Sequence, residues 1–426
     1  MPSGIVKALA AITNFAFYRG ARDDDCIDRL NHMVMHGLLI FLAIFTGTKQ
    51  FVGSPIYCWL PTNYDEKYQR KFANNYCWVH TMYNVPFDDP VPVSEESRYY
   101  HDVSYYRWSS MMFIFLAALF RIPQLLWKDL KKYSGANIEK LVGMTAETTL
   151  MDQDKRDEQL GHVAEFIHRW ATTRNMSHRK GKFASIENSV SKFMFCYGKR
   201  SGHNLVLIYL FIKFLYLINS ISQFFIISRF LKTNYWEFGV NAVRTYAQHG
   251  QWENEDVFPR VALCDMKVRA LANVYIYTLQ CVLGINLFLE KFFFVIWFCL
   301  IVIMILNALS FLKWTVQLLH EEKAVGFLTK YMGQLFPKKS LTPTDKKMFL
   351  AMARRYLQKD GVFVIRMIAD NSTSLLTVDL IRQIWLRYLH FRSEESQKTG
   401  GDYSKIDQND VKLLDRGETK IDDVDK

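Results

Sequence analysis

The sequence predicts an all-α membrane protein with four transmembrane helices, a disulfide-linked extracellular region and a helical cytoplasmic dome. Half of its 426 residues are hydrophobic and 15% are aromatic. These residues collect in four long apolar runs, and the segments that follow the first and third runs contain two cysteines each. A helix of about 20 apolar residues crosses the roughly 30 Å hydrocarbon core of a bilayer, and each run is long enough to do so.

The predicted spans are residues 30–51, 105–127, 204–231 and 286–314. The fourth span is the clearest, because residues 292–306 contain no charged side chain. A buried helix of a soluble protein would carry polar side chains at regular intervals along one face. The N-terminal segment 1–29 lacks a basic start, a compact apolar core and a small-residue cleavage site, so we expect no signal peptide and a cytoplasmic N-terminus.

This topology places loop 1 (residues 52–104) and loop 2 (residues 232–285) outside the cell. The inner loop, 128–203, contains 14 Lys or Arg, against four in loop 1 and five in loop 2. Cytoplasmic loops carry such an excess of basic residues, so the charges agree with the orientation. Residues 315–391 are predicted to form a cytoplasmic helical domain, and the polar, charged segment 392–426 a disordered tail.

The membrane topology is sufficient to explain the formal net charge of +11. The basic residues are mixed with acidic ones and belong to no motif that would present them to a duplex, so no nucleic-acid partner is expected. Contact of the inner basic loop with anionic membrane lipids and a solvated basic face are the two interpretations of that loop.

Four of the seven cysteines lie in the predicted outer loops, Cys58 and Cys77 in loop 1 and Cys264 and Cys281 in loop 2. Disulfides form and persist outside the cell, so an even number of cysteines there predicts two bridges, with three connectivities to choose from. Cys58 and Cys281 each lie near a span, whereas Cys77 and Cys264 lie further from one. Matching these depths favours the pairs Cys58–Cys281 and Cys77–Cys264.

Metal binding and nucleophilic catalysis are the alternatives for these cysteines. No close Cys-x-x-Cys or His-x-x-x-His pair accompanies them, as a zinc site would require. A catalytic Cys264 would need an unpaired thiol and a nearby base, and the carboxylate of Asp265 beside it disfavours a thiolate. The sequence also lacks a phosphate-binding glycine loop and a Ser-His-Asp order, so we predict no enzyme activity, no metal and no cofactor.

Several motifs together resemble those of one family. The sequence YYRW is similar to a YYQW signature at the start of a second span, and the proline of RIPQLLWKDL stands where that span carries one. FPRVALCDMKVR is similar to a signature of the second outer loop, and YCWLP and NNYCWV to the cysteine contexts of the first. The family is the innexins, the invertebrate gap-junction proteins related to pannexins. The matching signature positions are Tyr105, Tyr106, Trp108, Pro123, Phe258, Pro259 and Arg260.

The resemblance implies a gap-junction channel subunit in the plasma membrane, at cell-cell junctions. Identical or related subunits would form a ring, octameric in this family, which docks on an opposed ring of a neighbouring cell and passes ions and small molecules. The N-terminal segment would enter the pore mouth; a helix lying against lipid is its other interpretation. The pore-lining candidates are Pro2, Ser3, Lys7, Asp23, Asp24 and Asp25.

Two functions compete with the gap junction. One is an undocked hemichannel that releases small molecules, and the other is a four-span adhesion or scaffold protein. The only Asn-x-Ser/Thr sequences start at Asn175 and Asn371, both in predicted cytoplasmic segments, so the outer loops carry no acceptor for an N-linked glycan. Because a sugar would obstruct contact between rings, this pattern favours a docking subunit.

Some positions depart from the family pattern or are unusual within a span. Arg107 and Ser109 replace the family's Gln and Val, which predicts an altered polar contact at the start of the second span. Lys213, inside the third span, is expected to snorkel to the cytoplasmic headgroups rather than line the pore. His32 and His36 favour polar packing over metal binding or pH sensing.

Overall fold

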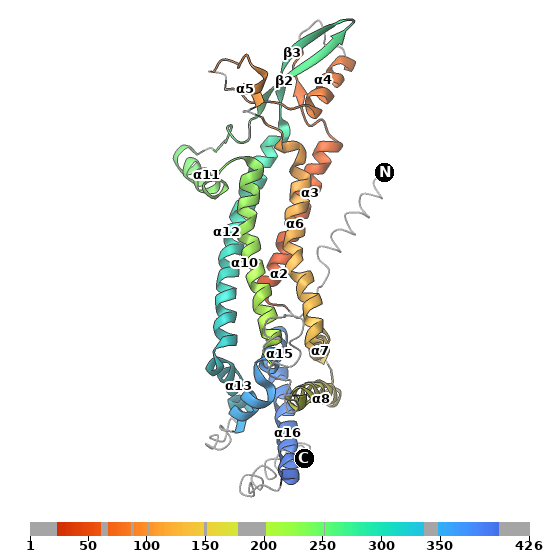
Figure 1. Ribbon diagram of the computed structural model, residues 1–426, viewed down its shortest axis with the longest axis vertical. Helices are drawn as coiled ribbons and strands as arrows, with labels where there is room; N and C mark the ends of the chain where they lie inside the picture. The colour runs from red at the N-terminus through yellow and green to blue at the C-terminus, as the bar shows by residue number, and fades with distance from the viewer. Residues whose placement is uncertain are drawn as a thin grey trace, which may run out of the picture. The chain divides into compact units, whose positions relative to one another are not determined.

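The structure is a computed structural model, and it describes residues 24–60, 67–86, 89–99, 102–148, 151–177, 202–250, 252–335 and 348–399. Within these ranges, four helical segments are long and apolar enough to cross a membrane (Figure 1). They are Cys26–Phe51, Tyr105–Leu130 (α6), Asn204–Leu231 (α10) and Gly284–Leu319 (α12). The predicted four-span fold class is therefore confirmed.

The first of these helical segments is not uniform. It consists of α2 (Cys26–Arg29), a π-helical stretch Leu30–Met35, and α3 (His36–Phe51). In a π-helical stretch each backbone hydrogen bond spans five residues instead of four, and such stretches are often found at functional positions. Here the stretch carries the buried polar residues Asn31 and His32.

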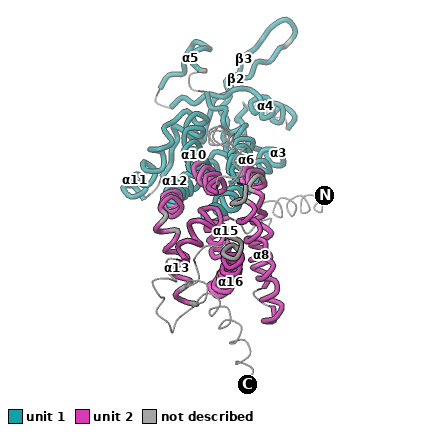
Figure 2. Tube along the Cα trace, turned by 60° about the horizontal axis from the view of Figure 1, so that its bottom comes forward, with its two compact units in different colours: residues 1–18, 27–124, 215–309 teal, residues 19–26, 125–214, 310–426 magenta. Residues whose placement is uncertain are grey.

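The described residues form two compact units (Figure 2). Unit 1 comprises Ile27–Gln124 and Leu215–Leu309, and unit 2 comprises residues 24–26, Leu125–Phe214 and 310–399. The long helices α6, α10 and α12 contribute residues to both units.

The core of unit 1 is apolar and rich in aromatic rings. Phe293 of α12 lies at its centre, with its ring centroid 5.3 Å from that of Phe113 in α6 and 5.7 Å from that of Phe258 in loop 2. All three side chains are fully buried. Burying a large apolar side chain stabilises a protein by about 1.5–3 kcal/mol when the exposed state is in water, so these contacts fasten loop 2 to the spans.

Unit 1 also contains a three-stranded antiparallel sheet in the order β1-β3-β2. The strands are β1 (Tyr57–Cys58), β2 (Val261–Ala270) and β3 (Asn273–Val282). The sequence analysis predicted no sheet. In the structure β2 alternates with a period of two, since Ala262, Cys264 and Met266 are buried while their neighbours are not, the pattern of a strand with one covered face.

The residues in the turn explain why the hairpin was not predicted from the sequence. Two-residue hairpin turns usually contain Asn-Gly or Asp-Gly, because they need positive φ angles. Here Leu271 occupies the turn with φ of 52° and its side chain fully exposed. A positive φ strains a residue with a branched side chain, and strain of this kind is concentrated at functional positions.

Three helices complete the loops of unit 1: α4 (Lys67–Val79) and α5 (Glu95–Tyr99) in loop 1, and α11 (Tyr235–His249) in loop 2. α11 ends at Gly250, whose φ of 68° gives the left-handed C-cap that glycine accepts best. In its middle, Gly239 lies against the indole of Trp297 in α12, so closely that a Cβ atom there would be 2.0 Å from the ring.

The described residues of unit 2 form helices and the short connections between them. Its best-buried helix is α15 (Gln358–Asn371), in which Val362 to Ile368 are buried on every face, as expected of a central helix. Arg387 of α16 (Ser374–Thr399) donates to Glu165 of α8 (Gln153–Ser177) over 3.1 Å. The other helices that lie wholly in unit 2 are a 3₁₀ helix, Lys131–Ser134, α7 (Ile138–Glu147), α13 (Glu321–Leu335) and a π-helical stretch, Met352–Leu357.

The close approach at Gly239 leads to a stability prediction. Gly239→Ala should destabilise the protein by about 1–3 kcal/mol, the usual cost of overpacking, because Trp297 and α11 must move apart. Gly284→Ala is the matched control, since a Cβ there meets nothing within 4 Å. Thermal unfolding of the detergent-purified variants measures both. Equal melting temperatures would contradict the prediction.

Candidate functional site

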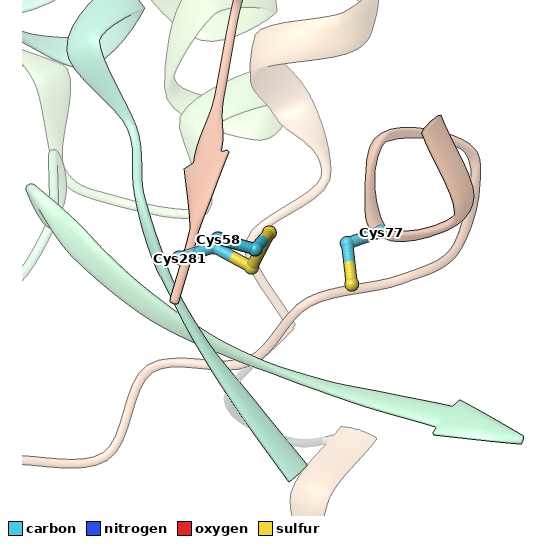
Figure 3. Close-up of side chains that lie close together, drawn as sticks. All are labelled: Cys58, Cys77 and Cys281. Atoms are coloured by element: carbon cyan, nitrogen blue, oxygen red, sulfur yellow. A yellow bond between two sulfur atoms is a disulfide. The ribbon is translucent and has the colours of Figure 1, made fainter. Parts of the chain in front are cut away.

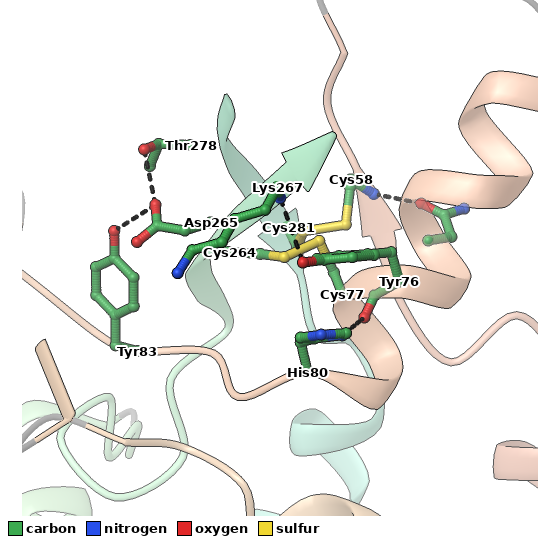
Figure 4. The surroundings of a disulfide bond; sticks show 11 residues. Cys58, Tyr76, Cys77, His80, Tyr83, Cys264, Asp265, Lys267, Thr278 and Cys281 are labelled. Atoms are coloured by element: carbon green, nitrogen blue, oxygen red, sulfur yellow. Dashed lines mark hydrogen bonds between the residues drawn. A yellow bond between two sulfur atoms is a disulfide. The ribbon is translucent and has the colours of Figure 1, made fainter. Parts of the chain in front are cut away.

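Two disulfide bonds connect loop 1 to loop 2. Cys58 of β1 is bonded to Cys281 of β3, and Cys77 of α4 is bonded to Cys264 of β2 (Figure 4). These are the pairs that the depth argument favours. All four cysteines are buried. Each bond closes a ring of about 200 residues, with sequence separations of 223 and 187.

Backbone hydrogen bonds join the same two loops on both edges of the hairpin. On one edge, Cys58 pairs with Cys281 in the ladder between β1 and β3. On the other edge, the N–H of Tyr83 donates to the carbonyl of Leu263 over 3.0 Å, and Leu263 donates back over 2.8 Å. Loop 1 therefore holds the hairpin of loop 2 from both sides, so the two loops form one body.

The bridges lie close to each other. Within the described residues, the Sγ atoms of Cys58, Cys77 and Cys281 lie within 4.8 Å of one another, and Figure 3 shows that the three side chains come from different elements. Three sulfurs at this spacing could hold a soft metal ion as thiolates. Their disulfide bonds leave no thiolate, so the arrangement serves as a cross-link.

A polar cluster around Asp265 reinforces this link, and the sequence analysis missed it. The Asp265 carboxylate accepts hydrogen bonds from the Tyr83 hydroxyl over 3.1 Å and the Thr278 hydroxyl over 2.7 Å (Figure 4). Its other oxygen pairs with the Arg98 guanidinium over 2.6 Å. Burial, followed by the neighbouring Asp265 carboxylate, raises the pKa of Tyr83 to about 12, so the hydroxyl stays protonated and donates at physiological pH.

The signature residues of loop 2 fasten the start of β2 to the spans. Phe258 packs edge-on against Tyr105 at 5.6 Å. The carbonyl of Pro259 accepts a 2.7 Å hydrogen bond from Asn286 in α12. Arg260 pairs with Glu253 over 2.8 Å, and its guanidinium lies 3.9 Å from the buried carboxylate of Glu290. In this chain the motif therefore has a structural role, because it attaches the start of β2 to the spans.

The start of the second span packs against helix α4 of loop 1 and against the end of the first span. Tyr106 is fully buried and lies 5.1 Å from the Trp78 ring, whereas Trp108 is largely exposed. Ser109 donates to the Tyr106 carbonyl and accepts from Gln50 over 3.0 Å. The expected altered polar contact is therefore present, because the family's valine could not bond to Gln50.

Two further positions of the second span are Arg107, which departs from the family pattern, and Pro123, which belongs to it. The Arg107 guanidinium donates to the carbonyl of Val79, the last residue of α4. Pro123 lies inside α6, which continues to Leu130. A proline there removes one backbone donor from the helix, and the described contacts assign it no further role.

Among the pore-lining candidates, Pro2, Ser3, Lys7 and Asp23 lie outside the described residues. Asp24 is buried in unit 2. Asp25 faces inward: its carboxylate lies 3.2 Å from the Lys213 ammonium and accepts hydrogen bonds from Ser310 over 3.2 Å and Trp314 over 3.0 Å.

The snorkelling prediction for Lys213 is wrong. Its side chain is 2% exposed, and its ammonium also donates to Ser310 over 2.9 Å. The partner was hidden from sequence reasoning, because Asp25 lies 188 residues away. A buried charge is stable only when it is paired and hydrogen-bonded, and Asp25 supplies both conditions.

The lowered pKa of Asp25 keeps its carboxylate ionised at physiological pH. Burial raises the pKa, but the Lys213 charge and the hydrogen bonds from Trp314 and Lys213 outweigh it and lower the pKa from 3.8 to about 2. A lowered pKa contributes stability above the unfolded value of 3.8, and this stability is lost as the pH falls toward 2. The pair is therefore no sensor of physiological pH.

Polar residues of the first span are also satisfied within unit 1. His36 lies 3.0 Å from the carbonyl of Ala117, and the His32 carbonyl accepts from Arg121 over 3.2 Å. These contacts agree with polar packing. Asn31 and Asn307 exchange two amide hydrogen bonds of 2.7 and 3.0 Å, an unpredicted link between the first and fourth spans.

The ion pair between Lys213 and Asp25 leads to a stability prediction. Lys213→Met should leave Asp25 as a poorly compensated charge and cost about 3–5 kcal/mol. Lys213→Met combined with Asp25→Asn should cost less than either single change, because no buried charge is left. Thermal unfolding of the purified protein measures the cycle. Lys132→Met, which removes an exposed pair with Asp129, is the control and should cost at most about 1 kcal/mol. Equal effects of Lys213→Met and Lys132→Met would contradict the prediction.

Comparison with known proteins identifies the family. The sequence model of the innexin family matches residues 24–388. The chain is 30% identical to Innexin unc-9 of Caenorhabditis elegans over 86% of its own length and 92% of that protein. It is 31% identical to Innexin-11 of the same organism, covering 86% and 79%, and 32% identical to Innexin-10, covering 94% and 71%. This chain, with its four spans and cross-linked loops, belongs to the innexin family of gap-junction channel proteins.

Proposed function

We propose that identical or related copies of this chain form a ring around a central pore, eight copies as the family implies, and that two such rings dock between adjacent cells. Ions and small molecules would then pass directly from one cell to the next. The observation that carries the proposal is the covalent and hydrogen-bonded joining of loop 1 to loop 2. A surface that is already ordered loses less conformational entropy on binding, which suits two rings that must meet in register.

The orientation in this proposal has loops 1 and 2 outside the plasma membrane and both termini in the cytoplasm. Two lines of reasoning support it. Disulfides persist in an oxidising environment, and both bridges belong to these loops. The loop between α6 and α10 carries the excess of basic residues, which favours the cytoplasmic side.

The hairpin tip is our candidate for the surface that meets the opposed ring. Leu271 is fully exposed and holds a positive φ, so the chain keeps a strained apolar residue where Asn or Gly would fit more easily. Contact with a partner would explain an apolar side chain at this position. The absence of an Asn-x-Ser/Thr sequence from both loops leaves this surface free of N-linked sugar.

The pore lining is the remaining part of the proposal. The family implies that the N-terminal segment enters the pore, with Pro2, Ser3 and Lys7 near the constriction and Asp23 near the cytoplasmic vestibule. Asp24 and Asp25 would lie at the inner vestibule. Because Asp25 contacts Lys213 and Trp314, its proposed role is structural: it would fix the point at which the N-terminal segment leaves the first span, rather than contact ions.

Conductance between paired cells tests this function. Two cells that each express only this chain should share a junctional current. Cys264→Ser should abolish it, because one bridge between the loops is lost, whereas Cys26→Ser, which changes an exposed free cysteine, should leave it unchanged. Leu271→Asn is a milder variant, since Asn tolerates a positive φ; it should reach the surface normally and lose current.

Other outcomes select the competing functions. Uptake of dye from the bath without transfer to the paired cell would indicate an undocked hemichannel. Accumulation of the protein at cell contacts, with neither dye uptake nor current, would indicate an adhesion or scaffold protein. Surface biotinylation of every variant separates lost function from lost delivery.

A further inference from the structure

The helix α11 of loop 2 has three different faces. Tyr235, Phe238, Gly239 and Ala242 are buried against the rest of unit 1. At about 100° per residue, a second face carries Val240, Val243 and Ala247, which are all exposed. The third face is polar and carries Glu237, Asn241, Arg244 and Gln248. The buried face packs on protein and the polar face suits water. The exposed apolar face suits neither, so something else must cover it.

The neighbours of α11 show at what depth it lies. Residues 292–312 of α12 contain no charged side chain, and at 1.5 Å per residue they span roughly 30 Å, the thickness of the hydrocarbon core. Lys291 marks one end of this stretch. Trp297, which donates to the Trp236 carbonyl over 3.3 Å, lies roughly 9 Å further into it.

The contacts with α10 give a similar depth. Trp236 stacks on Phe224 with ring centroids 4.1 Å apart and lies 6.1 Å from Phe225. Phe225 lies about 6 Å along the helix from Arg229, the last charged residue of α10. Amphipathic helices in the membrane interface insert their apolar face about 5–10 Å into the boundary between headgroups and acyl chains. Both estimates for α11 fall in this range.

The exposed apolar face of α11 adjoins exposed apolar surface on α10. Phe225 is 61% exposed on α10 and contacts Trp236 at the start of α11. Aromatic side chains collect at this level, as they do at membrane interfaces: Tyr246 is exposed, and the Lys291 ammonium lies 4.5 Å from the centre of the Trp252 ring.

The position of α11 is fixed by its surroundings. Only three residues separate it from the end of α10, and Lys232 among them has a φ of 54° that turns the chain. The contact between Gly239 and Trp297 then holds the helix directly against α12 (Figure 1). The apolar face thus stays at one depth and orientation.

We propose that α11 is an interfacial helix that binds the lipid of the outer leaflet through Val240, Val243 and Ala247. Each subunit would then rest on the membrane through loop 2 as well as through its four spans. The polar face, with Arg244 and Gln248, would lie toward headgroups and water. This proposal does not depend on docking, so it can be tested on single, undocked assemblies.

Quenching by brominated lipid tests the proposal. Replacing Cys26, Cys196 and Cys299 by Ser leaves the four disulfide cysteines, and a single Val243→Cys or Arg244→Cys then carries a bimane label. The labelled full-length protein is placed in nanodiscs of phosphatidylcholine with plain or brominated acyl chains. Bimane at position 243 should lose fluorescence in brominated lipid, while bimane at position 244, one residue away on the polar face, should keep it.

The same design gives the outcomes that would overturn the proposal. No quenching at position 243 would mean that protein covers this face, as a neighbouring copy of the chain would. Equal quenching at positions 243 and 244 would mean that the helix has no oriented interfacial position. Val240→Cys repeats the measurement on the same face if Val243→Cys does not assemble, and it carries the same expectation.

Discussion

The two disulfide bonds between loop 1 and loop 2 are the constraint on which the arrangement of these two loops depends. The loops belong to different pairs of spans, and without a link they would order independently. Each bridge closes a ring of about 200 residues, for which the chain-entropy model gives a stabilisation of about 5 kcal/mol. Hydrogen bonds then fix how the linked loops are arranged. They are the ladder between β1 and β3, the backbone pair of Tyr83 and Leu263, and the cluster around Asp265.

Buried polar contacts have a comparable role within each unit. In unit 1, Asn31 and Asn307 link the first and fourth spans through two amide hydrogen bonds. In unit 2, the buried Lys213 forms an ion pair with the partly buried Asp25, and Ser310 and Trp314 add hydrogen bonds to it. Polar groups in a membrane protein are costly unless a partner satisfies them. Such pairs therefore determine which helix faces meet.

The sequence predicts local properties of this chain well and distant contacts poorly. Hydropathy alone locates the four spans, and depth matching selects the pairs of cysteines. The hairpin was missed because the turn at Leu271 lacks Asn or Gly and because its alternation is short. Asp265 was considered only as a neighbour of Cys264, and Lys213 was misinterpreted, because their partners Arg98 and Asp25 lie 167 and 188 residues away. Polar partners at such separations leave no periodic pattern.

Mapping of disulfide-linked peptides tests the central claim most directly. Surface protein from intact cells is alkylated without reduction, digested and examined by mass spectrometry. Our account predicts one linked pair of peptides containing Cys58 and Cys281 and another containing Cys77 and Cys264, with alkylation confined to the other three cysteines. Bonds within a loop, joining Cys58 to Cys77 and Cys264 to Cys281, would contradict it, as would alkylation of any of these four thiols.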